Sequence, residues 1–509
     1  MSHGFGEDAQ ANMTPWLILA VAGVYFGVLC TIAWWTGRKA DAAGYFLGNR
    51  QSPWYIVAFG LIGDSLSGVT YISVPGKVAV DRFGYFQMVL GYVLGYALIA
   101  EVLIPMYYRL NLTSIYGFLG ERFGSVAQKT GSGFFLLSRM LGAAARLYLA
   151  ANVFQKFVFE EMGVPFFVTV SGIILLMLAY TLKGGIRTLV WTDSFQSLFL
   201  VLGVVLSLVI IGGDLGLGVG GMVTRVWESE MSGVFNWDWR SPGYFWKQFL
   251  SGAAITLVMT GLDQNNMQKS LSCPTPGTAK KNLYSFALVQ VPVNLFFLSL
   301  GVLLFGYAKE RGVAIPTSTD QLFPTLALQH LGTWAAVVFV LGLTAATFNS
   351  ADSVLTTLTT SFCFDFLGLE QREDLSTAQK DRRRRWVHFG FAMLLLWVIV
   401  AFKAAGTMAV IDLVFKLASF TYGPLLGLFA LGLATRVRVG GPWVPVVCVA
   451  APIVCWELSQ HSATWLGGYK FGTELLLLNG ALTMSGLVLL ARRGSLKLED
   501  SSLKEAPRL

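Results

Sequence analysis

Apolar residues follow one another along this chain in long runs, with little alternation between apolar and polar positions. Residues 195–212 and 389–402 are two such runs. A helix needs about 20 mostly apolar residues to cross the hydrocarbon core of a membrane. Because such segments recur along the chain, the pattern predicts an all-α integral membrane protein. A single transmembrane domain would cover residues 1–492, followed by a short cytoplasmic tail over 493–509.

The apolar segments divide into about thirteen predicted spans. We place them at 15–36, 53–76, 84–108, 132–157, 164–182, 188–213, 245–268, 282–307, 333–362, 386–404, 408–434, 441–458 and 471–491. Basic residues gather in alternate loops between these spans. Those loops contain Arg38, Lys39 and Arg50, then Arg109, Arg122 and Lys129, then Lys183 and Arg187, then Lys269, Lys280 and Lys281, and later 382–385, Arg436 and Arg438.

This distribution of lysine and arginine predicts the orientation of the chain in the membrane. About 25 of the 37 basic residues lie on one side by our count, and the positive-inside rule makes that side cytoplasmic. The N-terminus is then predicted to lie outside and the C-terminus inside a plasma (inner) membrane. The opposite loop, 214–244, carries Trp227, Trp237 and Trp239, which are typical of anchors at a membrane interface.

The composition and the absence of certain motifs argue against a soluble domain, a nucleic-acid-binding protein and an enzyme. The chain is 54% hydrophobic and 13% charged, where a soluble domain has roughly 25% charged residues. The positive-inside bias accounts for the net charge of +8, and no nucleic-acid motif accompanies it. The histidines and cysteines form no HExxH or CxxC pattern, and no P-loop or catalytic constellation is present. We therefore expect neither an enzyme nor an organic cofactor.

Glycines and polar residues interrupt two of the predicted spans. The second span holds Gly60, Gly63, Gly68 and Gly76 among Asp64, Ser65, Ser67, Thr70 and Tyr71; the seventh holds Gly252 and Gly261 before Asp263, Gln264, Asn265 and Asn266. Backbone leaves helical geometry at membrane depth only where it lines a cavity or is buried in protein. Its freed carbonyls then bind cations, and half-helix N-termini face anions. Alternatively, such glycines only permit close helix packing, an explanation that suits Gly91 and Gly95.

The two interrupted spans are five helices apart, so they run in opposite directions. That arrangement predicts an inverted five-plus-five repeat, with its first half over 45–214 and its second over 240–436. One span precedes the repeat and two follow it.

Five motifs give the chain a resemblance to the sodium/solute symporter family, over roughly 45–436. They are YFLGNR (45–50), YTLKGGIRTLVWTDSFQ (180–196), GLDQNNMQK (261–269), ATFNSADS (346–353) and YGPLLGLF (422–429). The family includes sodium/glucose, sodium/proline and sodium/sialic acid carriers. The resemblance implies the leucine-transporter type fold and alternating access.

The resemblance also implies a sodium site between the first broken helix and residues 346–353. Its ligands would be the carbonyls of Gly63, Leu66 and Ala346 and the side chains of Asn349 and Ser350. Positions 346, 349, 350 and 353 share one face of a helix, and a hard cation requires several oxygens. Asn349 departs from the family's usual serine. The alternative is a polar stripe that makes hydrogen bonds between helices.

Asp193 matches an aspartate that some family members use for a second sodium ion. The accompanying hydroxyl positions are Asp352 and Ser353 here. Two carboxylates that approach one another repel unless a cation or a proton lies between them. The interpretations left open are a second sodium ion, a proton on Asp193 or Asp352 in a proton-coupled carrier, and an Asp193 that only pairs near its helix end, for example with Arg187.

Polar residues at the two breaks and on the following span predict the substrate site. They are Ser65, Ser67, Thr70, Tyr71, Asp263, Gln264, Asn266 and Gln290. Asp263 aligns with a sugar-binding side chain of the sodium/galactose carrier, but Gln290 and Phe415 depart from that carrier. Residues 67–76 look more like the monocarboxylate, vitamin and iodide branch. Asp263 suits hydroxyls or an amine better than a carboxylate, or else only hydrogen-bonds to the unwound backbone.

The sequence thus predicts symport of a small organic solute into the cell, coupled to sodium. The membrane potential would add about 2.3 kcal/mol per charge per 100 mV to the sodium gradient. The expected partners are sodium, the solute and the lipid bilayer, and a monomer should suffice for transport. The alternatives are a proton-coupled carrier of the same fold and, less favoured, a transport-like sensor or an intramembrane enzyme.

Overall fold

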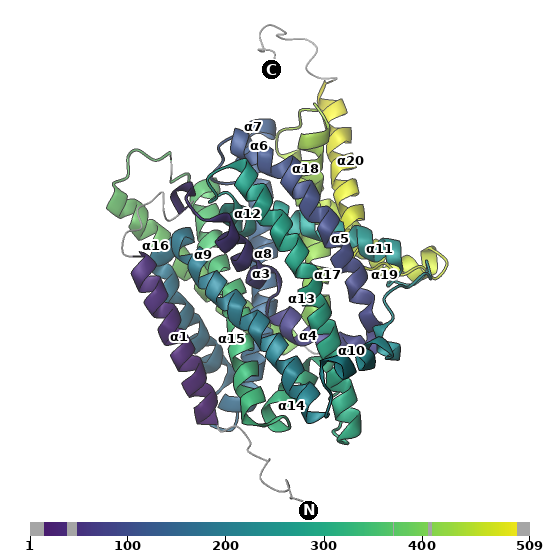
Figure 1. The fold of residues 1–509 in the computed structure, drawn as a ribbon. Helices are drawn as coiled ribbons and strands as arrows, with labels where there is room; N and C mark the ends of the chain where they lie inside the picture. The colour runs from purple at the N-terminus through teal and green to yellow at the C-terminus, as the bar shows by residue number, and fades with distance from the viewer. Residues whose placement is uncertain (1–14, 38–47, 370, 406–409, 496–509) are drawn as a thin grey trace, which may run out of the picture.

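The computed structural model describes residues 15–37, 48–369, 371–405 and 410–495, and every regular element among them is helical (Figure 1). The N-terminal residues Glu7 and Asp8, the first residues of the YFLGNR motif and the tail from residue 496 lie outside this description. The α-helices are α1 (Pro15–Gly37), α3 (Trp54–Ser65), α4 (Gly68–Asp81), α5 (Tyr85–Leu98), α6 (Ile104–Arg109), α7 (Gly117–Phe123), α8 (Ser125–Phe154), α9 (Phe166–Asp214), α10 (Val219–Trp227), α11 (Phe245–Thr256), α12 (Gln264–Ser270), α13 (Pro276–Glu310), α14 (Leu322–Gln329), α15 (Gly332–Ser361), α16 (Thr377–Ala405), α17 (Val410–Thr421), α18 (Gly423–Ala434), α19 (Trp443–Trp465) and α20 (Leu475–Ser495).

Each predicted span falls on one of these helices or on a pair of them, which confirms the all-α membrane fold class. By length and apolarity, eight helices of the described residues can cross a membrane on their own, or nine if the bent pair α17–α18 counts as one span. One of the eight, Gly68–Arg109, joins α4 of the first interrupted span to the predicted span that follows it. The α3 helix, the second interrupted span and the shorter apolar helices fall below that test because their regular segments are short. The number thirteen and the boundaries of the inverted repeat stay predictions.

Both predicted interruptions are present. Between α3 and α4 the chain leaves helical geometry at Leu66 (φ −93°, ψ 68°) and is extended at Ser67 (φ −71°, ψ 177°). Between α11 and α12 a π-helical turn over Leu257–Gly261 is followed by the extended Asp263 (φ −106°, ψ 119°). Each break therefore leaves main-chain groups without partners inside their own helix.

The spans predicted at 164–182 and 188–213 run together as α9. A single bend at Gly185 (φ 57°, ψ −169°) joins them, where a loop was expected. This backbone conformation is essentially restricted to glycine. The bend redirects the second half of α9, which carries Asp193 and Ser197.

Long helices hold the two broken segments from several sides. α15 and α3 both pack along α9, and α13 packs against α3, α4 and α5. α5 and α11 meet at glycines: a Cβ on Gly91 would lie 2.0 Å from the Phe249 carbonyl oxygen, and one on Gly252 would lie 2.1 Å from that of Met88. Small residues thus permit close approach of these two helices. In Figure 1 the start of α1 and the end of α20 lie at opposite ends of the molecule.

Candidate functional site

A cavity of about 80 Å³ lies beside the α3–α4 break. Helices α3, α4, α5, α8, α11, α12, α13 and α17 and the π-helical turn between α11 and α12 contribute to its wall. Five of the predicted substrate residues line it, namely Ser65, Ser67, Thr70, Asn266 and Gln290. Gln290 Nε2 donates a 2.7 Å hydrogen bond to Ser65 Oγ and so ties α13 to the end of α3. Both predicted breaks therefore contribute polar groups to one cavity.

The other three predicted substrate residues lie outside the cavity wall. Tyr71 points into an aromatic cluster with Phe297, Phe323 and Phe339. Gln264 accepts a 2.8 Å hydrogen bond from the Ile115 amide and donates a 2.7 Å bond to the Thr113 carbonyl. These two side chains hold neighbouring segments together and have no access to a solute in the cavity.

Asp263 has a structural position at the start of α12. Its Oδ1 accepts from the amides of Asn265 and Asn266, as an N-cap does. Its Oδ2 lies 3.4 Å from Arg139 Nε and accepts a 3.1 Å hydrogen bond from the Tyr422 hydroxyl. The geometry corresponds to the alternative in which Asp263 hydrogen-bonds to unwound backbone.

Two arginines on α8 belong to the cavity and were missed in the sequence. Arg139 and Arg146 are seven residues apart, two helical turns on one face, and both line the wall. They are 3% and 8% exposed. Within the described part of the chain, Arg146 Nη1 has no hydrogen-bond partner. Both arginines lie inside the predicted span 132–157, and this position could have identified them. An ionisable residue inside an apolar span is energetically unfavourable and usually has a function.

The predicted sodium site brings α3, α9 and α15 into contact. A Cβ on Gly63 would lie 2.2 Å from Asn349 Nδ2 and 2.7 Å from Ser197 Oγ, so the main chain of α3 touches both helices. Asn349 donates a 3.0 Å hydrogen bond to the Asp193 carbonyl, and its buried Oδ1 has no hydrogen-bond partner among the described residues. The side chains of Ser350 and Asp352 lie outside the description.

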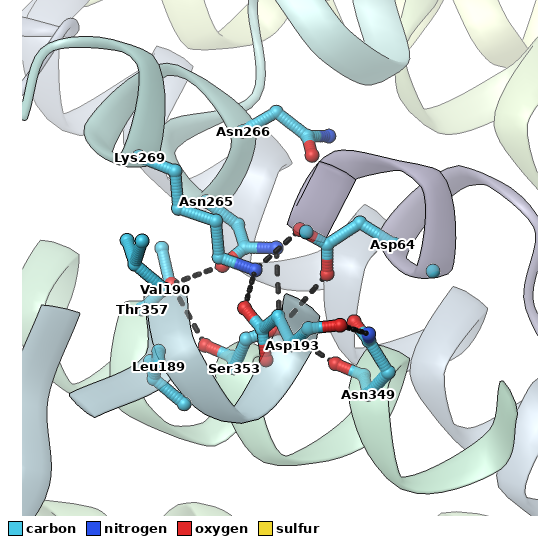
Figure 2. Close-up of polar contacts among 12 residues, drawn as sticks. Asp64, Leu189, Val190, Asp193, Asn265, Asn266, Lys269, Asn349, Ser353 and Thr357 are labelled. Carbon is cyan, nitrogen blue, oxygen red and sulfur yellow. Dashed lines mark hydrogen bonds and ion pairs between the residues drawn. The ribbon is translucent and has the colours of Figure 1, made fainter. Parts of the chain in front are cut away.

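A buried lysine occupies the neighbourhood where a second cation was considered. Figure 2 shows the Lys269 ammonium between the carboxylates of Asp64 and Asp193, and its Nζ lies 2.6 Å from Asp193 Oδ2. Ser353 donates a 3.3 Å hydrogen bond to Asp64 Oδ1. Assigning Lys269 to a cytoplasmic loop was wrong: it is 2% exposed within α12, because the chain re-enters a helix after the break at Asp263.

An aromatic pair separates this cavity from a larger one of about 710 Å³. Tyr85 and Phe415 line both cavities, with stacked rings whose centroids are 6.4 Å apart. The larger cavity is walled by the end of α4 and by the loop around Gly233 and Gly243, within the loop predicted to lie outside.

A polar cavity set among membrane-crossing helices, at the breaks of two of them, defines a membrane carrier. The chain belongs to the sodium:solute symporter family, whose model matches residues 45–438. It is 23% identical to the sodium/sialic acid symporter SiaT of Proteus mirabilis, in an alignment 524 positions long that covers 99% of each chain. It is 26% identical to sodium-coupled monocarboxylate transporter 2 of Danio rerio over 78% of this chain, but spans only 63% of that relative.

A solved structure has the same fold. A sodium-coupled sialic acid symporter in a substrate-bound outward-open state matches with a TM-score of 0.79 at 20% identity, over 94% of this chain and 98% of that one. The fold is therefore of the leucine-transporter type. The family and the relatives named here are sodium-coupled carriers by their descriptions, and none of them is an enzyme.

Proposed function

We propose that the protein carries a small organic anion with a carboxylate group into the cell together with sodium, by alternating access. The observation that carries the choice of substrate is the buried Arg146 guanidinium in the cavity wall. Two relatives, by their names, carry monocarboxylates and sialic acid, which are both acids. An anionic solute replaces the earlier preference for hydroxyls or an amine, because that preference depended on an accessible Asp263.

The charges around the cavity support an anion. Arg139 is paired with Asp263, and Asp64 is paired with Lys269, so these charges are largely compensated within the protein. Arg146 has no carboxylate within ion-pair distance among the described residues. A buried charge is strongly unfavourable unless it is paired. A substrate carboxylate would supply that partner. The other oxygens of the solute would accept hydrogen bonds from the polar side chains of the cavity wall, namely Ser65, Ser67, Thr70 and Gln290.

Sodium is proposed to bind at the carbonyls of Gly63, Leu66 and Ala346 with the side-chain oxygens of Asn349 and Ser350. The buried Oδ1 of Asn349 supports this set, since it lacks a donor and lies on the residue that touches Gly63. Leu66 stands between Ser65 and Ser67, which line the substrate cavity. Sodium at the Leu66 carbonyl would therefore fix the stretch of backbone that also holds the substrate, and this shared backbone is the proposed coupling.

The larger cavity and the basic loops together support an orientation for the proposed cycle. Its wall includes the loop around Gly233 and Gly243, so we place its mouth at the outer face of the plasma membrane, with the N-terminus outside and the C-terminus in the cytoplasm. Tyr85 and Phe415 would then form the boundary that a solute crosses on entry.

Transport in liposomes tests the proposal. We expect an inward sodium gradient to drive uptake of one or more acids from a panel of short monocarboxylates and sugar acids, and not of their neutral amides. Replacing sodium with choline should abolish the uptake. Sodium-driven uptake of a neutral sugar, with no acid transported, would contradict the assignment of an anion.

The substitution Arg146→Gln tests the proposed contact between the Arg146 guanidinium and the substrate carboxylate. Loss of a charged hydrogen bond costs about 1.5–3 kcal/mol, roughly a 10- to 150-fold loss of affinity for the acid. Arg225→Gln is the matched control, because Arg225 forms an exposed ion pair with Glu310 on the periphery. Equal affinities in Arg146→Gln and in the unmodified protein would remove Arg146 from the site.

A further inference from the structure

Lys269 is the one described lysine that is almost wholly buried, at 2% exposure, and it lies between two equally buried acids. Asp64 directly follows Gly63 in α3, and Asp193 lies in the second half of α9. Figure 2 shows the lysine reaching from α12 to both carboxylates. Three segments far apart in the sequence therefore meet at one ammonium group.

We propose that the Lys269 ammonium is a cation tethered by the protein, which holds the place between Asp64 and Asp193 that a second coupling ion would fill. The carrier then moves one sodium ion with each solute. This inference rests on the proposed sodium-coupled function and adds the number of ions to it. The sequence had left a second ion beside Asp193 open.

The contacts resemble those of a bound monovalent cation. The ammonium contacts one oxygen of each carboxylate, and Asp64 receives a further hydrogen bond from Ser353. Asn265 donates a 3.3 Å hydrogen bond to Ser353 and accepts a 3.1 Å bond from Thr357, so the surrounding groups are themselves held in place. An ion at this point would have to displace an ammonium paired with two buried acids.

The charge count favours one further cation and not two. Two carboxylates and one ammonium leave a net charge of −1 in the described cluster. One sodium ion at the neighbouring Gly63 and Leu66 carbonyls brings this to zero. Removing the lysine charge makes the net charge of the cluster −2. Removing the Asp193 charge as well returns the net charge to −1. Each substitution therefore predicts a different number of sodium ions.

The ammonium also links the sodium site to the second broken segment. Asp64 lies next to the proposed ligand Gly63, and the Asp193 carbonyl accepts a hydrogen bond from the proposed ligand Asn349. Lys269 lies near the C-terminal end of α12. This helix begins directly after the break, and Asp263 caps its N-terminus. A sodium ion that moves α3 would thus act on α12 through this ion pair.

The first test needs no variant. Radioactive sodium and radioactive substrate are taken up in parallel by liposomes that contain the full chain, with an acid that the uptake panel has identified. We expect one sodium per solute and a Hill coefficient for sodium close to one. A ratio of two would overturn this inference alone. Sodium-independent uptake would overturn the proposed function and this inference together.

The second test measures sodium binding to purified variants by calorimetry, so that it does not depend on transport. We expect two sodium ions bound in Lys269→Gln and one in the double variant Lys269→Gln/Asp193→Asn. Lys280→Gln is the control and should bind one, since Lys280 pairs with Glu101 at an exposed position. If Lys269→Gln still bound a single sodium ion, the Lys269 ammonium would not occupy the position of a second sodium ion. Should that variant fail to fold, the uptake ratio of the unmodified protein decides.

Discussion

Gly63 allows the main chain of α3 to touch α9 and α15 where the sodium site is proposed. A methyl group at this position would meet Asn349 Nδ2 at 2.2 Å and Ser197 Oγ at 2.7 Å, so one of those side chains has to move. We expect Gly63→Ala to bind sodium less tightly. Overpacking costs about 1–3 kcal/mol, equivalent to roughly 5- to 150-fold.

Sodium titrations followed by thermal unfolding measure this loss. Gly27→Ala on α1 is a suitable control, because a methyl group there meets no atom within 4 Å. An unchanged half-saturating sodium concentration in Gly63→Ala would place the ion away from α3.

At the residue scale the sequence predicted positions better than roles. Ser65, Ser67, Thr70, Asn266 and Gln290 were found because they are polar within apolar segments, and all line the cavity. Lys269 was misjudged and the role of Asp263 stayed open between two alternatives, because their partners, Asp64 and Arg139, come from distant helices. Such pairings depend on how helices pack, which a single sequence does not contain.

At the scale of elements, the bend in α9 sets where Asp193 and Ser197 lie. Gly185→Ala would place a side chain at φ 57° and ψ −169°, at a cost of about 1–3 kcal/mol. We expect a lower melting temperature and weaker sodium binding, because the half of α9 after the bend contacts Gly63 through Ser197.

Gly172→Ala, in the first half of the same helix, is the matched control. A methyl group there meets nothing within 4 Å, so its melting temperature should be unchanged or slightly higher. If Gly185→Ala and Gly172→Ala behaved alike, the bend would have no part in the site.

Apolar length predicted most helices, but not how they join. A loop was expected between 182 and 188, whereas α9 only bends there. The opposite holds at 408–434, where one predicted span is divided into two helices at 44°. The division lies at Tyr422, just before Pro424 in the first turn of α18, and Tyr422 donates a hydrogen bond to Asp263. Whether a glycine or proline bends, breaks or ends a helix depends on such neighbours.

For the whole molecule, the testable prediction is its orientation. In a Cys30→Ser background, Glu228→Cys reports on the loop predicted outside and Glu373→Cys on the loop beside the basic run 382–385. Cys30 has to be removed because it is exposed, while the remaining four cysteines are buried.

An impermeant thiol reagent added to intact cells should label the cysteine at position 228 and not the one at position 373. Permeabilised cells should allow labelling of both. The reverse pattern in intact cells would invert the orientation derived from the basic loops.

The tethered ammonium has an energetic consequence for the cell. Because Lys269 never leaves the protein, one sodium ion and one monovalent carboxylate are the only charges released on the far side. Their charges cancel, so the proposed cycle is electroneutral. A membrane voltage worth about 2.3 kcal/mol per charge per 100 mV would then neither drive nor oppose accumulation. Depolarised cells would concentrate the acid as well as polarised ones, to a limit set by the sodium concentration ratio alone.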